Sequence, residues 1–288
     1  MPAAPMVHAF FHEPTFTVTY VVADPVTRRA ALIDPVLDYD NKSGRPHTRS
    51  IDATLASAAA DGLTIDLIID THVHADHLSA AQHAKARTGA PVLIGDQVPV
   101  VQRAFRPVFG ATDMATDGSQ FDRLIADGEE LMLGQVPIRA MHTPGHTPAC
   151  MTYIIGDAAF VGDTLFMPDY GTARCDFPGG DAHILYRSIR RIFDLPPATR
   201  IFTCHDYKAP GRDSYAWESS VALQRATNIH IHDGIDEAAF VAMRTDRDAK
   251  LDLPALILPS VQVNMRGGKF PPPESDGHVY LRVPVDRF

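Results

Sequence analysis

Residues 71–77 read Thr-His-Val-His-Ala-Asp-His, and this short segment restricts the fold more than any other part of the chain. It follows the mostly apolar run 63–70, which is too short for a typical helix and predicts a buried strand. Three imidazoles and a carboxylate cannot be buried here without partners, because an unpaired polar group is costly in an apolar interior. Alternate residues at a strand end point the same way, so His72 and His74 can converge on one ligand.

Three later segments place further metal-binding side chains directly after predicted strands, where α/β folds usually have their sites. They are His146 in Thr-Pro-Gly-His-Thr, Asp163 in Val-Gly-Asp-Thr and His205 in Cys-His-Asp-Tyr. Taken singly, a buried histidine is more often structural, and Asp163 could simply form a turn. The chain, however, holds 14 histidines in 288 residues. This excess and the shared strand-end placement predict a metal site.

Hydrophobic periodicity predicts one α/β domain over residues 1–288, with residues 211–288 as a C-terminal extension. The expected strands are a hairpin over 16–36 and runs at 63–70, 91–94, 130–132, 136–141, 149–155, 158–161 and 200–203. The expected helices are one starting at Ser50 or Asp52, then 77–88, 98–109 broken by Pro107, 181–193 capped by Asp181, 215–227 and 235–248. Residues 38–50 and 111–120 are expected to be loops, and the end of the chain a proline-flanked tail.

The composition excludes several classes of protein. Lys and Arg number 26 against 35 Asp and Glu, a formal net charge of −9, so neither nucleic acid nor an anionic membrane is an expected partner. No stretch approaches the ~20 apolar residues of a membrane helix. The three cysteines, Cys150, Cys175 and Cys204, match no CxxC motif and indicate free thiols. Without a recognisable secretory signal, a cytoplasmic location is expected.

The histidine-rich segment resembles the signature HxHxDH of the metallo-β-lactamase superfamily. This resemblance implies a four-layer αββα sandwich. It also implies two neighbouring metal positions, the first formed by His72, His74 and His146. The second would be formed by Asp76, His77 and His205, with Asp163 between the two, and all seven positions are filled here.

Within that superfamily the chain looks most like the persulfide dioxygenases. Besides the metal-binding segments, this closer resemblance rests on Arg174-Cys175-Asp176-Phe177 with Gly179-Gly180, on Tyr207 after His205-Asp206, and on Asn264-Met265-Arg266. It implies one Fe(II) per chain, held by His72, His146 and Asp163 as a 2-His-1-carboxylate facial triad. His74, Asp76, His77 and His205 would then orient these ligands and shape the pocket, although the sequence leaves open whether they hold a second metal.

The implied reaction converts glutathione persulfide, O₂ and water into sulfite and glutathione. Arg174 is expected to organise the loop beside the site, by pairing with Asp176, and Tyr207 to bond the glutathione part. Arg225 and Arg244 could pair with glutathione carboxylates, or be solvated helix charges. Cys175 is either a small core residue or a thiol near the substrate sulfur. A homodimer and a sulfurtransferase that delivers substrate are both compatible with the sequence.

Two other functions remain open at this point. A dinuclear glutathione thioester hydrolase of the glyoxalase II type would use the same seven ligands, and residues 247–250 supply basic side chains near the C-terminus. A nucleic-acid-processing member of the superfamily is opposed by the net charge. The segments 38–50 and 97–120 look longer than in a minimal member of the superfamily, and they could form lids or dimer contacts.

Overall fold

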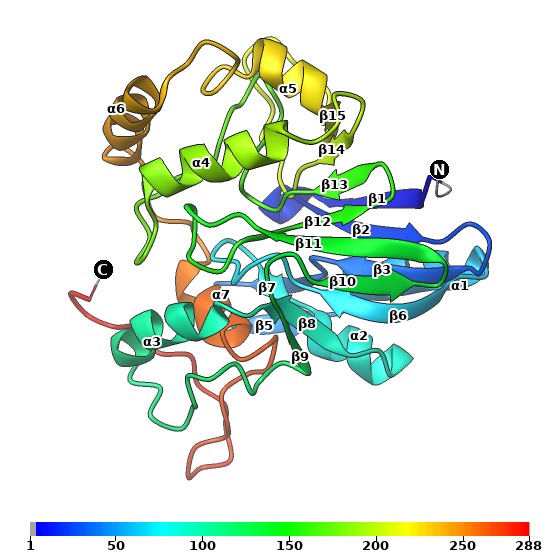
Figure 1. The fold of residues 1–288 in the computed structure, drawn as a ribbon. Coiled ribbons are helices and arrows are strands. Elements are labelled where there is room, and N and C mark those ends of the chain that lie inside the picture. Colours follow the sequence, from blue (N-terminus) through cyan, green and yellow to red (C-terminus); the bar gives the residue numbers. More distant parts are fainter. Residues whose placement is uncertain (1–3, 288) are drawn as a thin grey trace.

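The computed structural model describes residues 4–287, and it consists of four layers (Figure 1). Two six-stranded sheets lie face to face in the middle. In spatial order, the first sheet contains β1 (Met6–His12), β2 (Thr17–Ala23), β3 (Arg29–Ile33), β6 (Thr64–Ile69), β8 (Val92–Gly95) and β9 (Arg123–Ile125). The second contains β10 (Glu130–Leu133), β11 (Val136–His142), β12 (Met151–Ile155), β13 (Ala158–Phe160), β14 (Arg200–Phe202) and β15 (Glu218–Ser220).

Helices form the two outer layers (Figure 1). The first sheet is covered by α1 (Arg49–Ala60), α2 (Ala81–Thr88), α3 (Val98–Phe109) and α7 (Ile257–Asn264). The second is covered by α4 (Ala182–Phe193), α5 (Val221–Thr227) and α6 (Glu237–Asp248). The predicted αββα sandwich of the metallo-β-lactamase fold is therefore confirmed. No helix among the described residues is long and apolar enough to cross a membrane.

Side-chain alternation along the strands explains why the sheets have a covered face on each side. In β2, Val18, Tyr20 and Val22 point toward the second sheet and join the core between the sheets. Val21 and Ala23, at the alternate positions, pack under the helices of the outer layer. Both faces of the strand are covered, so all seven of its residues are buried, Thr17 and Thr19 included.

The helix of residues 182–193 illustrates how local sequence signals fix an outer element. The carboxylate of Asp181 accepts a hydrogen bond from the backbone N–H of Ile184 at 2.9 Å, as predicted for an N-cap. Leu185, Ile189 and Ile192 recur at helical spacing and are fully buried against the second sheet. The apolar stripe therefore determines which face of α4 packs onto the sheet.

Several element predictions were wrong. Residues 38–50 contain a hairpin of β4 (Val36–Asp40) and β5 (Arg45–His47), which pairs with β7 (Leu78–Ser79) in a small third sheet. Helix α3 is not broken at Pro107, because this proline lies in the last turn, shortly before the helix ends at Gly110. Residues 218–220 form β15 instead of helix. The predictions also missed β1, β9 and α7.

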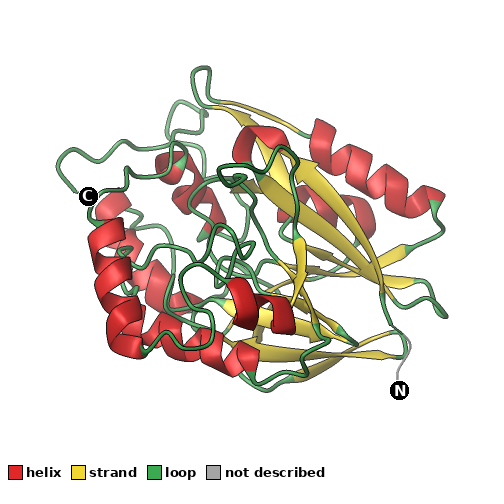
Figure 2. Ribbon diagram, turned by 90° about the horizontal axis from the view of Figure 1, so that it is seen from above, coloured by secondary structure: helices red, strands yellow, loops and turns green. Residues whose placement is uncertain are grey.

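Boundaries near the histidine-rich segment also differ. Helix α1 starts at Arg49 with Thr48 before it, and Ser50 instead bonds Asp38 through its backbone N–H and its hydroxyl. Helix α2 starts at Ala81 and not at His77, because residues 70–77 form a loop. The loops that follow the strands gather at one end of the sandwich (Figure 2), and this end holds the candidate metal site.

Candidate metal centre

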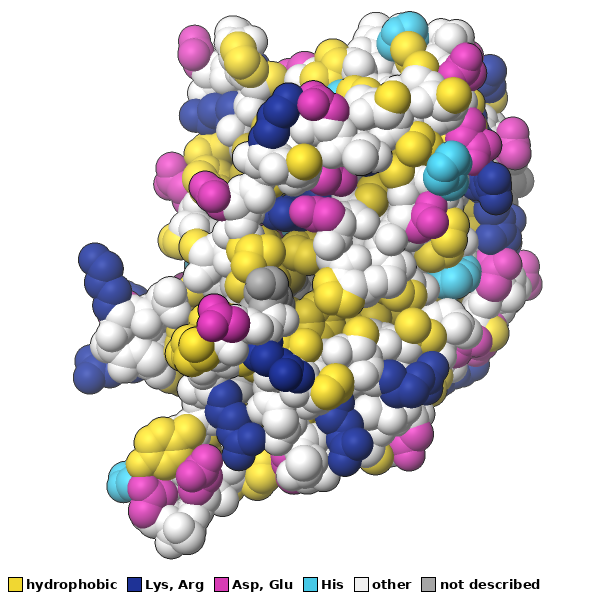
Figure 3. Space-filling model, turned by 90° about the vertical axis from the view of Figure 1, so that its left-hand side faces the viewer, with side chains coloured by type: hydrophobic (Ala, Val, Ile, Leu, Met, Phe, Trp, Pro, Cys, Tyr) yellow, Lys and Arg dark blue, Asp and Glu magenta, His cyan; other side chains and the backbone are white. Residues whose placement is uncertain are grey.

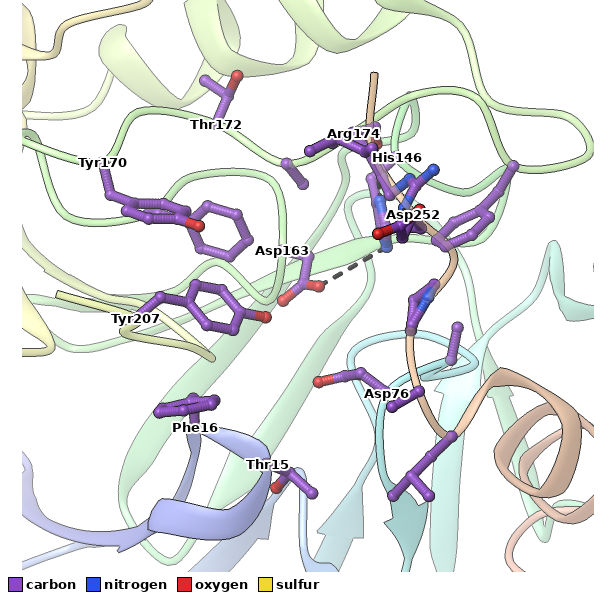
Figure 4. A pocket seen from close by; sticks show the side chains of 18 of the residues that line it. Thr15, Phe16, Asp76, His146, Asp163, Tyr170, Thr172, Arg174, Tyr207 and Asp252 are labelled. Carbon is purple, nitrogen blue, oxygen red and sulfur yellow. Dashed lines mark hydrogen bonds and ion pairs between the residues drawn. The ribbon is translucent and has the colours of Figure 1, made fainter. Parts of the chain in front are cut away.

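Strand ends from both sheets bring the predicted metal ligands together. The loop after β6 supplies His72, His74, Asp76 and His77, the loop after β11 His146, the end of β13 Asp163 and the end of β14 His205. All seven side chains converge, although they come from four segments spread over more than 130 residues of sequence (205 − 72 = 133). Asp163 lies centrally among them and its carboxylate points into a pocket (Figure 4).

The ligand atoms form two adjacent groups. In one, His72 Nε2 and His146 Nε2 each lie 3.7 Å from Asp163 Oδ2. The other group consists of His74, Asp76, His77 and His205. One ligand atom from each of these side chains lies within 4.8 Å of the ligand atoms of the other three. The second oxygen of Asp163 lies 3.4 Å from His205 Nε2, so this carboxylate stands between the two groups.

The inner atoms of both groups are buried and make no hydrogen bond. They are His72 Nε2, His74 Nδ1, Asp76 Oδ2, His77 Nε2, Asp163 Oδ1 and His205 Nε2. Buried polar atoms normally have partners, and six unbonded lone pairs facing one another are what a metal ion would satisfy. The donor set, imidazole and carboxylate, suits Fe(II) and Zn²⁺ alike. The residues present therefore fit a metal.

Outer hydrogen bonds hold the imidazoles in the orientation that a metal needs. His146 Nδ1 donates to the backbone oxygen of Arg174 at 2.8 Å, and His205 Nδ1 donates to the backbone oxygen of Phe16 at 3.2 Å. His74 Nε2 donates to Asp34 at 2.9 Å. Each bond fixes the proton on the outer nitrogen, so the inner nitrogen keeps its lone pair.

Asp34 is the functional residue that the sequence analysis missed. Its carboxylate accepts hydrogen bonds from the backbone N–H and the hydroxyl of Thr71, at 2.7 and 2.9 Å, besides the one from His74. Because the Thr71 hydroxyl donates to Asp34, it accepts from His72 Nδ1 at 3.0 Å. Asp34 thus orients two ligand histidines. Asp34 follows directly after an apolar strand, as Asp163 does, and this placement is a sequence signal that could have identified it.

Burial keeps two histidines of the centre, His72 and His74, ready to bind a cation. Desolvation, together with the neighbouring imidazoles, lowers the pKa of His72 and of His74 well below the ordinary value. Both rings are therefore neutral near pH 7, which is the ligand form. Desolvation alone would raise the pKa of Asp76, but His205 and His77 outweigh it and lower that pKa, so Asp76 stays ionised.

A cavity of about 380 Å³ opens onto this centre between the two helical layers. Aromatic rings of Phe16, Phe166, Tyr170 and Tyr207 form one wall, and Asp163 lies at its inner end (Figure 4). The cavity is also lined by two arginines of α6 and by the segment after it: Arg244, Arg247, Leu251, Asp252, Pro254, Ala255 and Leu256. Figure 3 shows the corresponding face, where hydrophobic side chains line a hollow and charged side chains surround it. Neither of the long segments 38–50 and 97–120 contributes a lining residue.

The predicted substrate-contacting residues have different surroundings. Arg174 and Tyr207 line the cavity, and the Tyr207 hydroxyl points toward Asp163 (Figure 4). Arg174 makes the expected bidentate pair with Asp176, with both distances 2.6 Å. Arg244 also lines the cavity, but it is 1% exposed and paired with Asp248, so it is not a solvated helix charge.

Two other predicted residues lie outside the cavity. Arg225 pairs with Asp233 at 2.9 Å on the surface and is not a lining residue. Cys175 is buried in the apolar cluster beneath α4, and burial raises the pKa of its thiol. The structure thus favours the small-core-residue alternative for Cys175 over a thiol that faces the substrate.

The fold and the ligand set define a metal-binding member of a known superfamily. Residues 12–205 match the metallo-beta-lactamase superfamily, and the chain belongs to it. A protein of Burkholderia pseudomallei (strain 1710b) named a probable metallo-hydrolase is 55% identical over 97% of this chain and 99% of its own length. The chain spans 65% of a beta-lactamase hydrolase-like protein of Xylella fastidiosa (strain Temecula1 / ATCC 700964), with 51% identity over 98% of this chain.

Relatives with more specific names point in two directions. Glyoxylase B2 of Dictyostelium discoideum is 42% identical over 92% of each chain. The mitochondrial persulfide dioxygenase ETHE1 of Bos taurus is 31% identical over 93% of this chain and 91% of its own. Among solved structures, ETHE1 from Myxococcus xanthus is similar with a TM-score of 0.73 and 31% identity, over 92% of this chain and 100% of that one.

Proposed function

We propose that this protein is an iron-dependent persulfide dioxygenase that oxidises glutathione persulfide with O₂ and water to sulfite and glutathione. The observation that carries the proposal is the group of His72, His146 and Asp163 at the inner end of the cavity. Two imidazoles and one carboxylate are the ligand set of non-haem iron oxygenases. The likeness to a persulfide dioxygenase over nearly the whole chain, including the segment after residue 205, supports this choice.

In this proposal Fe(II) is held by His72, His146 and Asp163. When bound, it supplies open coordination positions for O₂ and a substrate sulfur, together with the redox chemistry. The chain's own residues do the rest. Burial raises the pKa of Tyr207 well above its ordinary value, so its hydroxyl keeps its proton and is available as a hydrogen-bond donor to a bound substrate. The aromatic wall excludes water from the reacting sulfur.

A second candidate function rests on the adjacent group of His74, Asp76, His77 and His205. Its four ligand atoms lie close enough to hold another metal ion. With two metals the site would suit a glyoxalase II-type thioester hydrolase, in which a metal-bound hydroxide attacks a carbonyl. The names of the Burkholderia and Dictyostelium relatives favour this alternative.

The deciding experiment measures O₂ uptake by the Fe(II)-loaded protein on addition of glutathione persulfide, with sulfite formation as a second readout. Hydrolysis of a glutathione thioester is measured on the same preparation, and bound metal is quantified per chain. We expect saturable O₂ uptake with about one iron per chain.

Two variants make this test specific. His72→Ala removes a ligand of the iron group and should abolish both iron retention and O₂ uptake. His77→Ala changes only the adjacent group and should leave one iron bound. Absence of O₂ uptake with one iron verified would overturn the dioxygenase proposal, and two tightly bound metals with rapid thioester hydrolysis would establish the alternative.

A further inference from the structure

The charged groups around the cavity are not equally available to a ligand. Three arginines line it, Arg174, Arg244 and Arg247. Arg174 is held by both oxygens of Asp176, and its remaining terminal nitrogen donates to the backbone oxygen of Asp252 at 2.6 Å. Arg244 is fully buried, where it bonds Asp248 at 2.5 Å and the backbone oxygen of Thr172 at 3.0 Å. Both guanidinium groups are thus neutralised within the protein.

Two other charged side chains that line the cavity remain unpaired. The guanidinium of Arg247 and the carboxylate of Asp252 are exposed and line the cavity. Neither side chain has a hydrogen-bond or ion-pair partner within residues 4–287. In Figure 4 Asp252 lies across the cavity from Tyr170 and Tyr207. A cation and an anion, five residues apart in sequence, are therefore left without a partner at the rim of a mostly apolar cavity.

From this arrangement we infer that the cavity recognises the zwitterionic α-amino-acid group of a thiol carrier, with Arg247 binding its carboxylate and Asp252 its ammonium. The inference rests on the proposed function in one respect, namely that the substrate is a persulfide. Arginine binds a carboxylate bidentately, and a free carboxylate pairs with an ammonium group. Carriers with a free α-amino acid, such as glutathione or cysteine, satisfy both rim charges at once.

Hydrogen bonds hold this rim in place. The backbone oxygen of Asp252 is fixed by Arg174. The last turn of α6, from which Arg247 projects, is fixed by Asp248, which binds Arg244 and also accepts a hydrogen bond from the backbone N–H of Cys175 at 2.8 Å. The paired arginines thus position the two unpaired side chains. Pre-organisation of this kind lowers the entropic cost of binding.

The positive charge near Arg247 also affects the neighbouring His230. Burial and the charges of Arg244 and Arg247 lower the pKa of His230 to about 4. The imidazole is therefore neutral near pH 7 and does not supply the positive charge itself. Of the three arginines that line the cavity, only Arg247 has no carboxylate partner among residues 4–287, so an arriving carboxylate would find its guanidinium free.

The test is a binding experiment that needs no turnover. Isothermal calorimetry on the metal-loaded protein without O₂ compares glutathione with two analogues. One is N-acetylglutathione, which lacks the ammonium charge, and the other has the α-carboxylate of the γ-glutamyl residue converted to an amide. Asp252→Asn should weaken glutathione binding roughly tenfold and leave N-acetylglutathione unchanged, because that ligand has lost the partner group. Arg247→Met should weaken glutathione and N-acetylglutathione but not the amide.

Control variants separate this pattern from a general change of charge. Asp246→Asn and Arg187→Met alter exposed residues outside the cavity and should bind all three ligands like the parent protein. Circular dichroism confirms folding of each variant. Equal weakening of all ligands by Asp252→Asn, no weakening at all, or no glutathione binding by the parent protein would overturn the inference. If the ligand-specific pattern holds while O₂ uptake is absent, the inference stands and the dioxygenase proposal fails.

Discussion

At the scale of single residues, the centre depends on side chains that do not themselves face the metal position. Asp34 is the clearest case, since it accepts three hydrogen bonds and thereby orients His72 and His74. It does so from a left-handed backbone conformation, with φ of +50°. Such a conformation costs about 1–3 kcal/mol for a residue other than glycine and persists where the surrounding structure requires it. This residue thus combines a strained backbone with an orienting role.

Asp34→Asn should test that role. Asparagine tolerates the left-handed conformation, so the backbone is left undisturbed, but its amide cannot accept all three hydrogen bonds. We expect a loss of about 1–3 kcal/mol in the free energy of unfolding, and less metal retained per chain. Denaturant unfolding and metal analysis measure the two effects. Asp213→Asn, at an exposed residue away from the centre, is the matched control, and full metal retention by Asp34→Asn would contradict the role.

At the scale of elements, helix α7 acts as a clamp on the histidine-rich loop. The side-chain amide of Asn264 donates to the backbone oxygens of His74 and His77, at 2.8 and 2.7 Å. Its oxygen accepts from the backbone N–H of Ser79 at 2.8 Å. A residue near the C-terminus therefore fixes the backbone of a loop almost two hundred positions earlier.

Asn264→Ala should loosen this clamp. Removing three hydrogen bonds at about 1 kcal/mol each predicts roughly 3 kcal/mol lower stability. Asn264→Asp serves as the comparison, because it keeps the acceptor for Ser79 but loses both donated bonds. Hydrogen exchange at residues 74–79 reports the loop directly. Protection factors there that match the parent protein in both variants would rule the clamp out.

The segment just after helix α7 is tied to residues 97–120 by a titratable pair, Arg266 with Asp113, at 2.6 and 3.0 Å. The hydrogen bonds from Arg266 are the main cause that lowers the pKa of Asp113 from 3.8. A carboxyl group with a lowered folded pKa stabilises the protein above its unfolded pKa, and this contribution disappears as pH falls through the folded value.

Asp113→Asn should therefore have a pH-dependent effect on stability. We expect the parent protein to be the more stable of the two at neutral pH, and the difference to shrink below about pH 4 as Asp113 becomes protonated. Urea unfolding between about pH 3 and pH 7 measures it. A difference that grows toward acid pH would have the wrong sign for this pair.

At the scale of the whole molecule, residues 211–288 are integrated into both helical layers. Val221, Ile231 and Phe240 are buried against the second sheet, and Ile257, Val261, Val263 and Met265 are buried against the first. Each such side chain contributes about 1.5–3 kcal/mol by burial, and folded domains are stable by only about 5–15 kcal/mol in total.

A chain ending after Pro210 should consequently fail to fold. We expect no cooperative unfolding transition by circular dichroism or calorimetry, and no metal retention. A chain ending after Gly268 keeps all seven of these core residues and should unfold cooperatively. If the shorter chain also unfolds cooperatively, residues 211–288 are an appendage, and the single-domain interpretation needs revision.

The predictions of helices and strands succeeded where the segment itself contains a strong signal, such as an apolar run or a capping side chain. The strand before the histidines, and the helix capped by Asp181, are specified by apolar runs and a capping side chain within the segment itself. The hairpin of β4 and β5 and the short helix α7 were missed, because polar or proline-containing sequence forms them only against a partner. Residues 36–37 pair with 78–79, and α7 packs on β7.

By itself the sequence determined the ligand types and the fold that presents them. Histidines and carboxylates at strand ends are local patterns, and a polar cluster after an apolar strand has few stable explanations other than a metal site. The tertiary structure alone decided which polar groups are already satisfied. In the folded chain, carboxylates neutralise Arg174 and Arg244. Arg225 and Cys175 lie away from the cavity. Arg247 and Asp252 line the cavity and have no partner. Whether two charges pair depends on the distance between segments that only folding brings together, and local sequence patterns do not determine that distance.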